Sequence, residues 1–187
     1  NHDLFLFIEL DLIKTETISE KLKQIEKLKP KTKKAFFISN AGVIDPVGLI
    51  GKENENMLLE SIAVNVTAPA LIANYLVGLF NGLPLNITNI SSGAAKFPIE
   101  GWGAYCSGKA FSKMYFETLA LEKRGSSLVE VLNIDPGTMD TDMQKTIRST
   151  DYLSFPSLDK FVKLKNDGLL SDAETAARKI ITQIFYE

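Results

Sequence analysis

Four short segments that alternate with helical ones constrain the fold of this chain more than any other feature. Residues 4–10, 35–39, 85–91 and 128–134 are largely apolar or β-branched and carry few charges, which is typical of strands buried on both faces. The segments between them are long enough to hold a helix, and parallel strands need such crossover connections. The pattern predicts an α/β fold, with a doubly wound parallel sheet covered by helices on both faces. We expect a single domain over residues 1–187.

The composition narrows the possible functions without selecting one. The net charge of −2 and the pI near 5.6 give no electrostatic reason to expect nucleic acid or an anionic membrane as a partner. The only cysteine, Cys106, excludes an internal disulfide, and neither a signal peptide nor an apolar run of about eighteen residues is present. A reducing cytoplasm is therefore the expected location. The only histidine, at position 2, excludes His-based triads and most zinc sites, so we expect no metal.

Local signals predict where the helices begin. Thr17-Ile18-Ser19-Glu20 and Ser171-Asp172-Ala173-Glu174 have the spacing of capping boxes, which predicts helix starts at both places. Longer helices are expected over about residues 54–80 and 102–124.

A serine, a tyrosine and a lysine stand where a strand and the following helix would bring them together. Ser92 follows the strand that ends near residue 91, and Tyr105 and Lys109 are four residues apart on one face of the expected helix. Ser92 would hydrogen-bond a substrate carbonyl while the Tyr105 phenol transfers a proton. Lys109 would lower the phenol pKa from its ordinary value of about 10. The Tyr–Lys pair alone is not diagnostic, since this spacing also arises by chance.

Asn65 falls on or near the apolar face of the long helix, where an amide needs partners. It either bonds a neighbouring backbone group or holds a water. Pro69 has no N–H to donate to the Asn65 carbonyl, which frees that carbonyl and predicts a kink. A core asparagine without a further role is the alternative.

The segment after the last strand predicts short helices near residues 138–149 and 158–165, separated at Pro156. Such segments often form a lid over a substrate. Met139 and Met143 are either adaptable substrate contacts or ordinary core residues.

Together with three further motifs, the serine, tyrosine and lysine resemble the active site of the short-chain dehydrogenase/reductases. Ser39-Asn40-Ala41-Gly42 resembles the family's Asn-Asn-Ala-Gly turn, and Asn65 matches the asparagine of its catalytic tetrad. Asp135-Pro136-Gly137-Thr138-Met139-Asp140-Thr141 resembles the Pro-Gly-x-x-x-Thr loop that holds the nicotinamide end of the cofactor. Within the family, residues 101–110 and 139–144 are most similar to sepiapterin reductases and bacterial benzil reductases.

The resemblance implies a Rossmann-like fold and an NADPH-dependent carbonyl reductase that acts on a small ketone or 1,2-dicarbonyl. It implies a homo-oligomer, either a dimer or a tetramer. The catalytic residues that it implies are Ser92, Tyr105, Lys109 and Asn65, with a relay water held by Asn65. The cofactor contacts that it implies are Asp11, Asn40, Ala41, Gly42, Tyr105, Lys109, Pro136, Gly137, Met139 and Thr141. The implied substrate contacts are Ser92, Gly93, Trp102, Tyr105, Gly137 and Met143.

One departure from the family pattern is large. Its Gly-rich turn, Thr-Gly-x-x-x-Gly-x-Gly, does not occur in the sequence, which opens on a run that resembles the family's third strand. We therefore expect a piece of a longer protein, incomplete at both ends. The same departure supports an alternative function, a catalytically inactive dehydrogenase-like protein that binds a nucleotide or regulates another protein.

Overall fold

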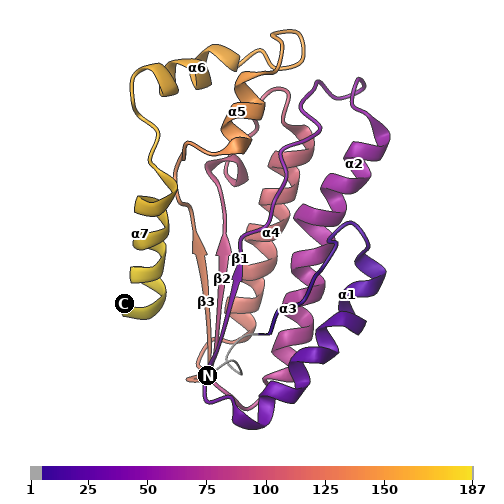
Figure 1. The fold of residues 1–187 in the computed structure, drawn as a ribbon, viewed down its shortest axis with the longest axis vertical. Helices are drawn as coiled ribbons and strands as arrows, with labels where there is room; N and C mark the ends of the chain where they lie inside the picture. Colours follow the sequence, from indigo (N-terminus) through magenta and orange to yellow (C-terminus); the bar gives the residue numbers. More distant parts are fainter. Residues whose placement is uncertain (1–5, 187) are drawn as a thin grey trace.

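The computed structural model describes residues 6–186 and is built on a three-stranded parallel sheet (Figure 1). The strands lie in the order β1-β2-β3. They match three of the four predicted segments, with bounds of Ala35–Ser39 for β1, Leu85–Ile90 for β2 and Val129–Ile134 for β3.

Strand β2 is buried along its whole length, yet it carries amide side chains that pair with β3. Asn86 Nδ2 donates to Glu130 Oε2 at 2.8 Å, and Asn89 Nδ2 donates to Asn133 Oδ1 at 2.8 Å. Each pair is also directly opposed in the parallel register. These contacts satisfy polar groups that would otherwise be costly to bury.

Helices cover both faces of the sheet, as the sequence predicts. On one face, Ile87 of β2 packs in a cluster with Phe116 of helix α4 and with residues of α3. Alternate residues of a strand point to opposite faces, and on the other face the Phe36 ring lies 4.6 Å from the Phe185 ring of α7. The bounds are Ala68–Leu79 for α3, Gly103–Glu122 for α4 and Ala173–Tyr186 for α7.

The predicted strand 4–10 is wrong in the part that the structure describes. Residues 6–10 form no β pairing, and the first two residues of the predicted strand lie outside the described range. Leu10 instead packs against Ile18 of helix α1, which spans Thr15–Leu22. A strand needs a hydrogen-bonded neighbour, and no strand among the described residues pairs with the outer edge of β1.

Two helix starts also differ from the prediction. Helix α1 begins before Thr17, whose hydroxyl donates to the Lys14 carbonyl at 2.8 Å instead of capping the helix, and the chain tightens into a 3-10 helix over Lys23–Lys31. Helix α7 is capped by Asp172, whose Oδ1 accepts from the Thr175 N–H at 2.8 Å. The capping residue is therefore one position after the predicted Ser171.

A π-helical turn interrupts the long helix at Asn65. Helices α2 (Glu55–Ile62) and α3 are joined without a break by the π-helical residues Ala63–Thr67. Pro69 cannot donate to the Asn65 carbonyl, and a π-helical turn is one way in which a helix absorbs a broken hydrogen bond. The kink predicted from Pro69 therefore takes the form of this turn.

The same stretch, Glu55–Leu79, is long and apolar enough to cross a membrane by length and composition, with a mean hydropathy of 1.6 over eighteen residues. The expectation concerned an uninterrupted apolar run, and polar residues such as Glu60 and Asn65 interrupt this one; the mean is high because the other residues are strongly apolar. In the fold this stretch packs against α1 and α4. One helix of this kind is weak evidence for a membrane.

Two short helices stand over the carboxyl ends of the strands, and we call residues 139–170 the lid (Figure 1). They are α5 (Asp142–Arg148) and α6 (Leu158–Asn166), close to the predicted segments. The two ends of the lid are joined, because the Asp140 N–H donates to the Ser171 carbonyl at 2.9 Å and the Ser171 N–H donates to the Thr138 carbonyl at 3.1 Å.

The contact between α4 and the π-helical turn depends on Gly108, since a methyl group there would lie 2.9 Å from Asn65 Cβ. We expect Gly108→Ala to lower the free energy of unfolding by about 1–3 kcal/mol, because the backbone must shift to accommodate the methyl group. Gly78→Ala in α3 is the matched control, because nothing lies within 4 Å of the added carbon. It should raise stability by about 0.5–1 kcal/mol through helix propensity. Urea unfolding measures both, and a Gly108→Ala variant as stable as the parent would contradict this packing.

Candidate active site

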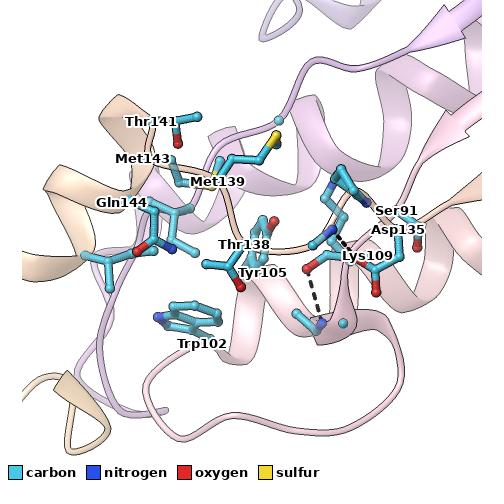
Figure 2. A pocket seen from close by; sticks show the side chains of 18 of the residues that line it. Ser91, Trp102, Tyr105, Lys109, Asp135, Thr138, Met139, Thr141, Met143 and Gln144 are labelled. Carbon is cyan, nitrogen blue, oxygen red and sulfur yellow. Dashed lines mark hydrogen bonds between the residues drawn. The ribbon is translucent and has the colours of Figure 1, made fainter. Parts of the chain in front are cut away.

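A cavity of about 640 Å³ opens at the carboxyl ends of the strands, beneath the lid (Figure 2). Its walls are the turns that follow the three strands, one face of α4, and the lid. Ligands of open α/β sheets bind at this edge, and the volume is in the range usual for small-molecule sites.

Ser92 lies in the turn that follows β2. Its backbone is extended, and its Oγ accepts from the Ala94 N–H at 3.2 Å, which caps the 3-10 turn Gly93–Ala95. A hydroxyl can donate one hydrogen bond in addition to those it accepts. The Ser92 O–H therefore remains available to a ligand in the cavity.

Helix α4 brings Tyr105 and Lys109 to the cavity one turn apart (Figure 2). Tyr105 is 7% exposed and meets the Trp102 ring edge-on, with 5.6 Å between the ring centroids. Lys109 Nζ lies 5.9 Å from the Tyr105 ring centroid and donates to the Ile90 carbonyl, at the end of β2, at 2.9 Å. The strand end thus fixes the ammonium group beside the phenol.

Burial controls the protonation of both groups. It raises the pKa of the Tyr105 phenol above its ordinary value, and the neighbouring Ser92 hydroxyl partly opposes that shift. Burial also lowers the pKa of the Lys109 ammonium. The predicted net lowering of the Tyr105 pKa is wrong, because desolvation dominates the phenol and the hydrogen bond of Lys109 goes to the Ile90 carbonyl. Tyr105 is therefore neutral at pH 7 and able to donate a proton.

Asn65 holds the turn that follows β1. Its Oδ1 accepts from the Val43 N–H at 3.0 Å, and its Nδ2 donates to the Val43 carbonyl at 2.8 Å and to Ser61 Oγ at 3.1 Å. These bonds match the first of the two predicted uses of the amide, and the relay water stays a prediction. Because both amide protons are engaged, the side chain has none left to donate to a relay water. Gly42 fits between Asn65 and Lys109, where a Cβ would lie 3.3 Å from Asn65 Oδ1 and 3.6 Å from Lys109 Nζ.

The residues that the resemblance assigns to the cofactor surround the cavity, with one exception. Asp11 is not among the lining residues; it lies in the turn before α1, where its Oδ1 accepts from the Ile13 N–H at 3.1 Å. The remaining set fits the nicotinamide end of a dinucleotide, because Gly137, at a φ of 77°, leaves its backbone open and Lys109 supplies a cation. The lining cofactor residues are Asn40, Ala41, Gly42, Tyr105, Lys109, Pro136, Gly137, Met139 and Thr141.

Aromatic side chains pack together where the lid meets the start of α4. Trp102 is 4% exposed and stacks on Phe155, with 5.1 Å between the centroids and 3° between the planes, and it also contacts Phe161 at 4.9 Å. Met143 packs against this cluster and lines the cavity, so it belongs to the core and is also placed where the predicted substrate contact would be. The predicted substrate contacts Ser92, Gly93, Trp102, Tyr105, Gly137 and Met143 all border the cavity.

Sequence reasoning missed several wall residues. Ile44, Phe161 and Leu164 supply apolar wall, and Asp135, Gln144 and Lys160 supply polar atoms. Phe161 and Leu164 are three positions apart on α6, and this helical spacing was the available signal. Nothing local distinguishes Gln144, which acquires its position only when the lid folds over the strands.

The parallel sheet, its two helical layers and the polar site at the strand ends define a Rossmann-like oxidoreductase domain. The family described as short chain dehydrogenase matches residues 1–152, and the chain belongs to this family.

Named relatives agree with this assignment. The chain is 34% identical to a benzil reductase ((S)-benzoin forming) of Bacillus subtilis (strain 168), with 78% of this chain and 61% of the relative aligned. It is 37% identical to the sepiapterin reductase of Mus musculus, with 78% of this chain and 56% of the relative aligned. The chain thus spans about three fifths of the length of these relatives.

Solved structures agree on the fold. The KRED1-Pglu enzyme superposes with a TM-score of 0.81 and 26% identity, covering 96% of this chain and 73% of that one. A short chain dehydrogenase/reductase from Saccharomyces cerevisiae has a TM-score of 0.77 at 26% identity, covering 91% of this chain and 66% of that one.

The lid is braced by Asp140, which pairs with Arg148 of α5 at 3.3 Å and with Lys165 of α6. Lys165, and then Arg148, hold the pKa of this carboxyl below its ordinary value. A lowered carboxyl pKa stabilises the fold at pH values above the ordinary value of about 3.9, and this contribution is lost as the pH falls through the lowered value.

We expect Trp102 fluorescence, which reports on the lid cluster, to change in an acid transition that Asp140→Asn abolishes. Asp140→Asn should already show the acid-form spectrum at pH 7. Asp172→Asn, which removes another carboxylate of lowered pKa and keeps an oxygen that can cap α7, is the control that leaves the transition in place. Identical acid titrations of Asp140→Asn and the parent would show that this brace does not hold the lid.

Proposed function

We propose that this chain carries the catalytic site of an NADPH-dependent carbonyl reductase that acts on a small ketone or 1,2-dicarbonyl. One observation carries the proposal: the Ser92 hydroxyl, the neutral Tyr105 phenol and the Lys109 ammonium border one cavity at the carboxyl ends of the strands. Membership of the short chain dehydrogenase family and the names of the relatives support it.

The turns after β1 and β3 would hold the nicotinamide end of the cofactor, through Asn40, Ala41 and Gly42 on one side and Pro136, Gly137, Met139 and Thr141 on the other. Lys109 would contact the ribose. When bound, NADPH supplies the hydride that reduces the carbonyl carbon.

The protein side chains complete the reduction at the carbonyl oxygen. The Ser92 O–H donates a hydrogen bond to this oxygen, and the Tyr105 O–H gives it a proton as its negative charge grows. The product is the alcohol, and a phenolate remains on Tyr105. Lys109 stabilises this phenolate by its charge, so it acts on the product of proton transfer and leaves the resting phenol neutral.

The cavity walls favour an apolar substrate. Trp102, Met143 and Phe161 supply large apolar surfaces, and a polyhydroxylated substrate would lose hydrogen bonds with water there. A second carbonyl next to the first makes the reacting carbon more electrophilic, which suits a site of one hydroxyl and one phenol. We therefore propose benzil-like 1,2-dicarbonyls or sepiapterin-like ketones as substrates.

The proposal extends to the setting of the enzyme. We propose a cytoplasmic homo-oligomer, a dimer or a tetramer, with a small-molecule carbonyl as its partner and with neither nucleic acid nor a membrane involved. Size-exclusion chromatography with light scattering tests the oligomeric state.

Tyr105→Phe in the complete natural protein tests the role of the phenol. It keeps the packing of the ring and removes the proton donor, so kcat should fall by about 10²–10⁴-fold while NADPH affinity changes little. Tyr75→Phe is the matched control, because that phenol donates to Glu26 at 2.6 Å on the outer side of α3. Lys109→Ala should impair both kcat and NADPH binding. Turnover by Tyr105→Phe at the parent rate would assign the proton transfer to another group.

NADPH consumption with benzil, sepiapterin, a steroid ketone and a ketose at equal concentration tests the substrate class. We expect benzil and sepiapterin to react faster than the other two, because each has a ketone next to an electron-withdrawing group, a second carbonyl in benzil and a ring C=N in sepiapterin. Faster turnover of the steroid or the ketose would overturn the dicarbonyl assignment and leave the reductase in place. NADPH binding without turnover of any carbonyl would instead favour the inactive, nucleotide-binding alternative.

A further inference from the structure

Gln144 is a buried polar residue of the lid for which the mechanism above has no use. It lies in α5, its side chain borders the cavity, and the residue is 7% exposed. In the view of Figure 2 its amide lies above the Trp102 ring, on the far side of Tyr105 from Lys109. The surfaces beside it, from Met143, Ile147 and Phe161, are apolar. A buried amide in such surroundings needs an explanation.

Arg148 determines which way the Gln144 amide faces. Arg148 Nη1 donates to Gln144 Oε1 at 3.4 Å, and Arg148 is held in turn by Asp140. A guanidinium group can only donate hydrogen bonds, so the amide oxygen must be the atom that faces it. The amide nitrogen Nε2 is then turned away from Arg148. Among residues 6–186 it donates to no protein group, and the atom is not enclosed by protein, so it is open to the cavity that the side chain borders.

We infer that Gln144 determines specificity by donating a hydrogen bond from Nε2 to a second carbonyl oxygen of the substrate, adjacent to the carbonyl that is reduced. This inference rests on the proposed carbonyl reduction. Ser92 and Tyr105 engage the reacting oxygen at the strand ends, and Gln144 offers the one buried amide donor on the lid side of the cavity among the described residues. An unpartnered donor in an apolar wall favours a substrate that brings an acceptor and disfavours one that brings a methylene group.

A matched pair of substrates isolates this contact. Benzil and deoxybenzoin have the same two phenyl rings, and a methylene group in deoxybenzoin replaces the second carbonyl. We expect Gln144→Leu to lower kcat/KM for benzil about three- to tenfold, the usual effect of losing one hydrogen bond, and to leave kcat/KM for deoxybenzoin unchanged or raised, because no donor is then left unpaired beside the methylene group. The KM for NADPH should not move. The exposed Gln24→Leu, far from the site in the 3-10 helix, is the control for loss of a glutamine.

Gln144→Glu is the second variant, because it keeps the shape of the side chain and an oxygen for Arg148 while removing the donor. It should lose the preference for benzil more completely than Gln144→Leu, since a carboxylate repels a carbonyl oxygen. Circular dichroism and thermal melting of both variants check that the lid and the sheet remain folded.

The outcomes distinguish the role of Gln144 from the proposed carbonyl reduction. Equal losses with benzil and deoxybenzoin, or a raised KM for NADPH with no change in the benzil preference, would overturn the role of Gln144 while the reductase stands. Turnover of neither substrate by the parent protein, together with no turnover of sepiapterin, a steroid ketone or a ketose, would overturn the proposed function, and the role of Gln144 with it.

Discussion

The site depends on the close approach of α4 to the π-helical turn that carries Asn65. Gly108 permits this approach, because any side chain there would collide with Asn65 Cβ. The Asn65 amide in turn holds the backbone of Val43 through two hydrogen bonds. One contact therefore sets the position of α4, with Tyr105 and Lys109 on it, relative to the turn after β1. Two features thus bring elements that are far apart in the sequence to one cavity. They are the lack of a side chain at Gly108 and the hydrogen-bonded amide of Asn65.

Desolvation is the dominant electrostatic effect at this site. It raises the pKa of the phenol and lowers that of the ammonium, so both groups shift toward their neutral forms. The Ile90 carbonyl accepts a hydrogen bond from Lys109 Nζ, and this bond favours the charged ammonium form against the desolvation. The site at rest thus holds a protonated acid beside a cation whose interaction with the acid becomes strong only after the proton has left. This arrangement suits a general acid, which must keep its proton until the substrate needs it.

Local sequence pattern predicted the elements that depend on nearby residues. The prediction failed for a strand, because a strand also depends on pairing with another strand. The strands at 35–39, 85–91 and 128–134 were predicted from apolar runs, and the grouping of Ser92, Tyr105 and Lys109 from strand ends and helical spacing. The segment 4–10 is apolar like these strands, yet residues 6–10 pair with no strand, and the outer edge of β1 is unpaired among the described residues. The phenol pKa and the place of Gln144 depend on burial by a lid folded from distant residues, and no local pattern contains that information.

The amide pairs between β2 and β3 have a consequence for the geometry of the cavity. Asn86–Glu130 and Asn89–Asn133 allow only one alignment of the two strands, since a shift of one residue would leave buried amides without partners. Ser91 and Asp135 each follow the last paired residues, Ile90 and Ile134, by one position. The amide pairs thus fix the register of β2 and β3, so that the two following turns begin at the same level along the strands. The position of the cavity floor therefore depends on buried polar pairs within the strands, which do not themselves line the cavity.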